Sequence, residues 1–173
     1  MLLNLKQPSY FLGIDPGQNG ALSIIKFNPG EWSIINNLVY CDSLRMHEVW
    51  GHKIFCPIHL LRVLDEIGIH KNNSFVLCEK VSPTKQGKVS AFNFGANSLG
   101  LINLLHQYCQ VLPAVSPAQW KKALQLSSDK SQSISRALSL FNNDERINTH
   151  DKAEASLLAL IGLTSTIKNH TKN

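Results

Sequence analysis

Four acidic residues in this chain have the spacing and surroundings of a shared metal site. Asp15 ends the apolar run Phe11-Leu-Gly-Ile-Asp15 and is followed by the turn residues Pro16-Gly17. Glu79 lies near the end of a second apolar run. Asp151 and Glu154 are three residues apart, so in a helix they share one face. A carboxylate at the end of a buried strand is costly unless a partner or a metal ion compensates its charge. The four residues are therefore the candidate catalytic and metal-binding set.

Carboxylate oxygens of this kind suit Mg²⁺, with Mn²⁺ as a substitute, better than they suit zinc. Two such ions roughly 4 Å apart can activate a water molecule and stabilise the leaving oxygen in phosphodiester hydrolysis. Each acid also has an ordinary interpretation. Asp15 could form a turn, Glu79 could pair with Lys80, and Asp151 and Glu154 could stabilise the start of a helix. Taken together they favour a two-metal site, because four converging carboxylates without a cation would repel one another.

Lysine residues adjoin the candidate acids in two clusters. The formal net charge of the chain is +5, which is compatible with a polyanionic partner. Lysine clusters often belong only to a solvated surface, but their position beside the acids favours contacts to DNA phosphates. His150, next to Asp151, could position a water molecule or a phosphate, or could simply be exposed at the start of a helix. The candidate DNA-binding residues are Lys80, Lys85, Lys88, Lys121, Lys122 and Lys130.

The chain as a whole is expected to form one domain, residues 1–173, with a buried core. No apolar run is long enough to cross a membrane, and the first residues are too polar for a signal peptide. The four cysteines include no CxxC pair, which argues against a zinc site and against a disulfide framework. A cytoplasmic location is therefore expected.

The elements that must position the acids follow from the apolar periodicity and the turn residues. The pattern predicts a mixed α/β sheet, its first three strands antiparallel, with helices on its faces. Residues 41–55 are expected to be irregular, and residues 82–90 to form a basic loop. The predicted strands are 10–14, 21–27, 32–40, 74–81 and 111–115, and the predicted helices are 57–67, 91–108, 117–124, 127–141 and 151–166.

Several of these segments resemble motifs of the RuvC-type Holliday junction resolvases, members of the ribonuclease H-like superfamily. The resemblance covers nearly the full length. It rests on Ile14-Asp15-Pro16-Gly17, Glu79-Lys80-Val81, Asp129-Lys130-Ser131-Gln132 and Asp151-Lys-Ala-Glu154-Ala-Ser-Leu-Leu-Ala.

The resemblance implies a five-stranded ribonuclease H-like sheet and a homodimeric, Mg²⁺-dependent endonuclease of DNA recombination and repair. Such an enzyme nicks two strands of a four-way DNA junction symmetrically, with two ions per active site and no nucleotide cofactor.

Two departures from the family pattern suggest a phage-encoded or otherwise divergent member. Glu154 stands where the family usually has aspartate, and Ser82 stands where an aromatic residue is common in cellular enzymes. Phe92 or Phe94 could replace that aromatic against an opened junction, although the helical pattern favours a core position for both. Trp120 is likewise expected to pack in the core rather than stack on a base.

Three other functions remain open on the sequence. The Asp-Pro-Gly-x-x-Gly turn also resembles the phosphate loop of actin-like ATPases and sugar kinases, but those proteins need two such domains and this chain has about half their length. A ribonuclease H-like nuclease acting on RNA or on other branched DNA is a closer alternative. A non-catalytic junction-binding protein is the third, and the four intact acids argue against it.

Overall fold

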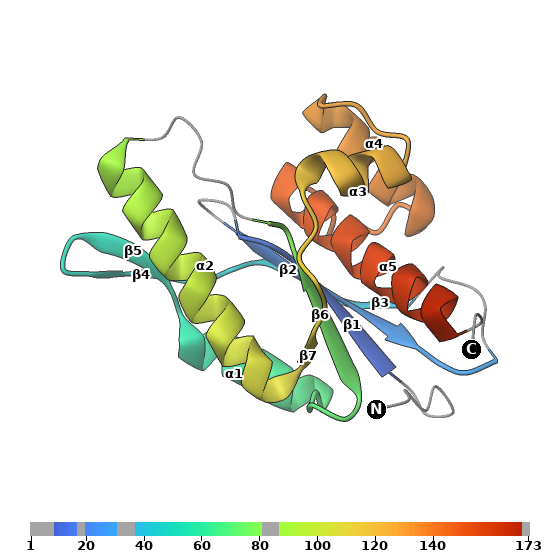
Figure 1. Ribbon diagram of the computed structural model, residues 1–173, viewed down its shortest axis with the longest axis horizontal. Helices are drawn as coiled ribbons and strands as arrows, with labels where there is room; N and C mark the ends of the chain where they lie inside the picture. The colour runs from blue at the N-terminus through green and yellow to red at the C-terminus, as the bar shows by residue number, and fades with distance from the viewer. Residues whose placement is uncertain (1–8, 17–19, 31–36, 81–86, 171–173) are drawn as a thin grey trace.

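The computed structural model describes residues 9–16, 20–30, 37–80 and 87–170, and its centre is a mixed five-stranded sheet (Figure 1). The strand order is β3-β2-β1-β6-β7. Antiparallel pairing joins the first three strands, as predicted, and β6 and β7 continue the sheet in parallel with β1. The strands are β1 (Ser9–Asp15), β2 (Ala21–Phe27), β3 (Leu38–Ser43), β6 (Ser74–Cys78) and β7 (Gln110–Val111).

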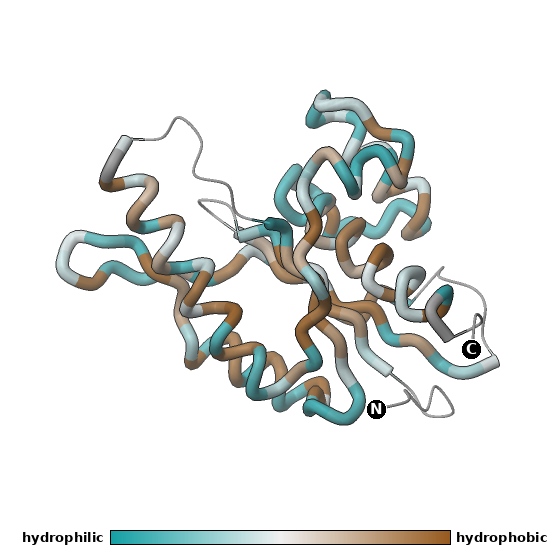
Figure 2. Tube along the Cα trace, viewed as in Figure 1, coloured by the Kyte–Doolittle hydropathy of each residue, from teal (hydrophilic) through white to brown (hydrophobic). Residues whose placement is uncertain are grey.

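The two central strands are apolar on both faces because helices cover both sides of the sheet. Phe11 and Phe75 face one core, where their rings lie 5.2 Å apart, and Leu12 and Val76 face the other. In Figure 2 the apolar residues gather along the strands and on the helix faces that meet them. The helices α3 (Pro117–Ala123), α4 (Lys130–Leu140) and α5 (His150–His170) supply the first core, and α1 (Pro57–Ile67) and α2 (Lys88–Tyr108) supply the second.

The predicted helix boundaries are largely confirmed by the local signals that set them. Pro57 starts α1, and Gly68 ends it with a φ of 77°. At the start of α3, Ser116 and Gln119 form a reciprocal capping box. The helix expected from residue 127 begins instead at Lys130, because the Asp129 side chain accepts the backbone N–H of Ser131 and caps α4 there.

The prediction of an irregular segment over residues 41–55 was wrong. Strand β3 continues to Ser43, and β4 (Met46–Val49) pairs with β5 (His52–Phe55) as an antiparallel hairpin. The apolar alternation of this hairpin is too weak to predict two strands from the residue pattern. Its position depends on Asn97 of α2, which accepts from Phe55 N at 3.0 Å and donates to Lys53 O at 2.8 Å.

Smaller corrections concern the ends of other strands and of one helix. The strand expected over 111–115 is reduced to Gln110–Val111, because Pro113 has no N–H for a ladder, and Val115 makes only an isolated bridge to Glu79. Strand β6 ends at Cys78 rather than 81, and α2 begins at Lys88 rather than 91. Residues 32–36 of the expected third strand and 82–86 of the expected basic loop lie outside the described residues.

Helix α5 lies directly on the backbone of β1. A Cβ atom added to Gly13 would be 2.0 Å from Ala155 O and 2.2 Å from Ala159 N, distances that no side chain tolerates. Only glycine on the strand and small residues on the helix permit this approach. The contact fixes the start of α5 beside the end of β1, where Asp15 lies. No helix within the described residues is long and apolar enough to span a membrane.

Candidate active site

Asp15 and Glu79 leave the same edge of the sheet. Ile14 pairs with Cys78 in the parallel register of β1 and β6, and Glu79 N donates to Ile14 O at 3.3 Å. Asp15 is buried and Glu79 is half-buried. Burial, together with the nearby charges of Asp15 and Glu79, raises the pKa of the Cys78 thiol to about 12. The parallel pairing therefore brings the first two predicted acids together.

Glu154 comes to the same place from α5. Burial raises the pKa of Glu79, and the carboxylate of Glu154 raises it as well, so the two acids are close enough to repel. A hydrogen bond from Trp120 and the positive potential of Lys121 and His150 oppose that rise. The negative charge of the two carboxylates is therefore only partly compensated by the side chains around them.

Three side chains contact one oxygen of Glu154. Its Oε1 lies 2.8 Å from Lys121 Nζ and accepts a hydrogen bond from Ser133 Oγ at 3.2 Å. His150 Nε2 is 3.0 Å from the same oxygen but lacks the direction of a hydrogen bond, so this buried nitrogen has no hydrogen-bond partner. The other ring nitrogen, Nδ1, is 3.6 Å from Asp151 Oδ1. His150 therefore lies between the two acids of α5.

Trp120 has a role that the sequence did not reveal. It is buried, as predicted, and its Nε1 donates to Glu79 Oε1 at 3.0 Å. A buried indole N–H needs an acceptor, and here the acceptor is a candidate catalytic carboxylate. Lys121 Nζ also lies 5.1 Å from the centre of the Trp120 ring. Helix α3 consequently holds both Glu79 and Glu154 in place.

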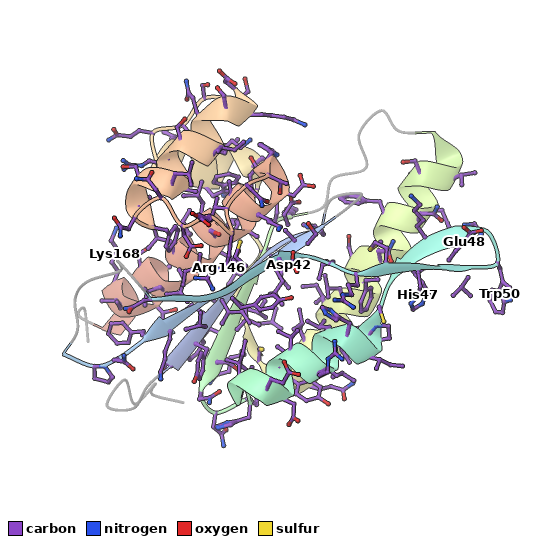
Figure 3. All side chains as sticks on the ribbon, turned by 180° about the vertical axis from the view of Figure 1, so that it is seen from behind. Asp42, His47, Glu48, Trp50, Arg146 and Lys168 are labelled. Carbon is purple, nitrogen blue, oxygen red and sulfur yellow. The ribbon has the colours of Figure 1, made fainter. Side chains whose placement is uncertain are left out.

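The start of α5 is fastened to β3 as well as to the central strands. Lys152 Nζ lies 3.0 Å from Asp42 Oδ1, and Arg146 Nη2 donates to Leu38 O at 2.6 Å, on the side of the sheet seen in Figure 3. An open groove beside these contacts is lined by Ser43, Leu44, Met46, Thr149, His150 and Asp151. The groove gives solvent, and so a substrate, access to Asp151.

The donor chemistry of the site fits a divalent cation. Carboxylate oxygens predominate, and the repulsion between Glu79 and Glu154 would be relieved by a positive ion. In the structure Lys121 supplies positive charge to Glu154. Within the described part of the chain, no three His, Cys, Asp or Glu side chains are grouped closely enough to hold an ion.

The predicted DNA-binding lysines occupy different environments. Lys80, Lys122 and Lys130 are exposed, whereas Lys121 is half-buried against Glu154. Lys85 and the side chain of Lys88 lie outside the described residues.

The expectation that Phe92 packs in the core was wrong. It is 64% exposed, because the face of α2 that carries it turns away from the sheet. Its ring centre lies 5.8 Å from that of His52 on the hairpin. Phe94 is half-buried.

The fold of the chain is similar to that of solved structures, although its sequence is not similar to that of known families. No protein-family model matches the chain, and no curated protein matches its sequence. Among solved structures, Thermus thermophilus RuvC in complex with a Holliday junction substrate superposes with a TM-score of 0.64 and 15% identity, covering 93% of this chain and 97% of that one. The chain has the fold of RuvC.

A second Thermus thermophilus RuvC structure matches with a TM-score of 0.61 and 18% identity over the same shares of the two chains. The RuvC-like, ribonuclease H-like sheet expected from the motifs is thereby confirmed. The low identity agrees with a divergent sequence on the RuvC fold.

Proposed function

We propose that the chain, acting as one nuclease domain, is a metal-dependent endonuclease that resolves four-way DNA junctions by paired nicks. The observation that carries the proposal is the position of Asp15 and Glu79 at one edge of a RuvC-like sheet, with Glu154 of α5 close enough to raise the pKa of Glu79 and Asp151 on the same helix. The RuvC structure found in complex with a Holliday junction supports the choice of substrate.

In this proposal Asp15, Glu79, Asp151 and Glu154 hold two Mg²⁺ ions, or Mn²⁺ in their place. When bound, the ions supply an activated water molecule and stabilise the leaving oxygen.

Trp120 orients the carboxylate of Glu79, and Lys121 with Ser133 orients that of Glu154. His150, which lies between Asp151 and Glu154, positions a water molecule or the scissile phosphate. Exposed Lys80, Lys122 and Lys130 contact the flanking phosphates.

An apolar stripe on α2 supports the dimer. Val89, Phe92 and Leu99 are 65%, 64% and 68% exposed, and their spacing of three and seven residues places them on one helix face. Exposed Ala96 lies between them on that face. A second copy packed on this stripe by two-fold symmetry would present two active sites to the two equivalent strands of a junction.

The test is cleavage of a synthetic four-way junction in Mg²⁺, set beside linear duplex, a flap and an RNA–DNA hybrid. We expect paired nicks in the junction and little cleavage of duplex. In Asp15→Asn we expect loss of cleavage by about 100-fold or more with junction binding retained, since shape is kept while a metal-binding charge is lost. Ca²⁺ should support binding without cleavage.

Each alternative has its own outcome in the same assay. Preferred cleavage of the hybrid or the flap would favour the nuclease on RNA or on other branched DNA. Binding without cleavage in every metal would favour the non-catalytic protein. Near-normal turnover by Asp15→Asn would remove the basis of the two-metal mechanism.

A further inference from the structure

The hairpin of β4 and β5 carries a tryptophan at its tip that contributes almost nothing to the core. Trp50 is 95% exposed, and Figure 3 shows it at the far end of the hairpin. It occupies, with Gly51, the two-residue connection between the paired residues Val49 and His52. Nothing in the described part of the chain therefore accounts for a large aromatic side chain here.

The backbone at the tip makes tryptophan an unfavourable choice. Trp50 has a φ of 52° and Gly51 a φ of 75°, the two positive values that a type I′ hairpin turn requires. Asn-Gly is the preferred pair in such turns, because asparagine tolerates the left-handed region better than bulky residues do. The tryptophan is held in a strained conformation in which its ring gains no packing.

The hairpin is firmly attached to the protein, so its tip has a defined position. Asn97 of α2 bonds to the backbone of β5 at two points, through Phe55 N and Lys53 O. The Phe55 ring packs closely against Gly100, where an added Cβ would be 3.2 Å from Phe55 Cε1. At the base of the hairpin Cys56 N donates to Arg45 O at 2.7 Å. These contacts hold the hairpin in place, and so they give the Trp50 backbone a defined position.

The surroundings of Trp50 are polar. Lys53 lies opposite Glu48 in the register of the two strands, which also carry two histidines, and Arg45 lies at the base of the hairpin. A protein partner would be expected to cover a contiguous apolar patch, such as the stripe on α2. An exposed aromatic ring at the tip of a polar hairpin is instead suited to a nucleobase, which offers a flat face for stacking.

We propose that Trp50 stacks on a nucleobase of branched DNA, at a branch point where bases lose a stacking neighbour. This inference rests on the proposed function and adds a recognition element outside the carboxylate site. Bases within a continuous duplex have both faces covered, so the contact favours branched or single-stranded DNA over duplex.

The decisive variant is Trp50→Asn, which removes the ring and restores the preferred turn residue. Binding is measured in Ca²⁺ by fluorescence anisotropy on a four-way junction, a duplex of the same arms and a single-stranded oligonucleotide. We expect junction and single-strand affinity to fall by about 5- to 150-fold, the range found for a lost base–aromatic stack, with duplex affinity unchanged. Trp50→Phe should recover part of the loss. A thermal midpoint no lower than that of the native chain would exclude misfolding.

Two measurements separate stacking from other effects. A junction carrying 2-aminopurine at the branch point should change its emission on binding the native chain but not on binding Trp50→Asn. Ile58→Asn, which alters another exposed apolar residue on α1, is the matched control and should bind as the native chain does. Sedimentation of Trp50→Asn should match that of the native chain.

The outcomes distinguish this inference from the proposed function. Unchanged junction affinity in Trp50→Asn, or loss of self-association in that variant, overturns the stacking role and leaves the proposed function standing. If the native chain shows no preference for a junction, the proposed function has failed. The single-stranded oligonucleotide then decides the inference, and equal binding by the two proteins overturns it.

Discussion

The negative charge of Glu79 is disfavoured by its surroundings in the candidate site. Burial raises the pKa of its carboxyl group, and Glu154 adds repulsion, while Trp120 holds one of its oxygens. A carboxylate kept at such a position is a cost to folding that a binding function explains better than stability does. Trp120 limits that cost by donating to the charged form.

We expect Glu79→Gln to stabilise the protein in EDTA and to abolish cleavage. The amide keeps an acceptor for Trp120 but removes the charge. Because the folded-state pKa of Glu79 is raised, the contribution of this residue to stability is greatest at low pH. That contribution is lost as pH rises from the ordinary value of 4.5 through the raised value. The midpoint of the variant should therefore exceed that of the native chain above this window by roughly 1–3 °C, and less below it.

Thermal unfolding in EDTA across this pH range tests the prediction, with Glu145→Gln as a control on an exposed carboxylate. A Glu79→Gln protein that is less stable than the native chain at neutral pH would show that the charge of Glu79 is favourable in the fold. The explanation by burial and repulsion would then be wrong.

At the scale of elements, the contact between α5 and β1 decides whether the acids meet. Two helical acids reach the edge of the sheet only because Gly13 lets Ala155 and Ala159 touch the strand backbone. Buried hydroxyls add to this contact, since Ser23 Oγ of β2 lies 2.8 Å from Ser156 Oγ of α5. The geometry of the site is therefore a property of helix–strand packing as much as of the acids.

We predict that Gly13→Ala destabilises the fold by about 3 kcal/mol or more, because the new methyl group overlaps backbone atoms that cannot move independently. Gly162→Ala, on α5, is the matched control. Its nearest neighbours are side-chain atoms at 3.4 and 3.5 Å, so it should change stability by less than about 1 kcal/mol.

Chemical denaturation measures both variants, and any folded Gly13→Ala protein should also lose cleavage because α5 is displaced. Equal stability of the two variants would mean that the close approach of α5 to β1 is not required.

For the whole molecule, the exposed stripe on α2 predicts a dimer whose loss affects paired nicking. Leu99→Glu places a charge at the C-terminal end of that stripe. We expect a monomer by sedimentation velocity at concentrations where the native chain is dimeric, with junction nicks becoming independent of each other. Ile58→Glu on α1 should remain dimeric. A dimeric Leu99→Glu protein would move the interface elsewhere.

The charge of the molecule predicts a strong dependence of DNA binding on salt. Each lysine that contacts a phosphate should contribute about 0.9 to the slope of log affinity against log salt. Lys122→Ala and Lys130→Ala should each reduce that slope by about this amount, while Lys71→Ala, on an exposed turn after α1, should not. Slopes that do not change in either variant would leave these lysines as solvated surface residues only.

Elements whose signals are local could be predicted from the amino-acid sequence. Apolar runs that end in turn residues predicted β1 and β2, and proline, glycine and the capping box predicted the ends of α1 and the start of α3. The edge of the sheet at which Asp15 and Glu79 emerge follows from the same runs, because each acid comes at or just after the end of its strand. The hairpin at residues 46–55 was missed because its alternation is weak and its support comes from Asn97, more than 40 residues away.

The groups that surround the acids depend on tertiary packing and could not be predicted from the residue pattern. The contact between Trp120 and Glu79 joins residues 41 apart, and that between Ser133 and Glu154 joins residues 21 apart. Neither has a local signal, since each depends on how α3 and α4 dock against α5 and the sheet. The exposure of Phe92 and the unsupported ring of Trp50 are also tertiary facts, because an apolar residue type does not say whether a neighbouring element will cover it.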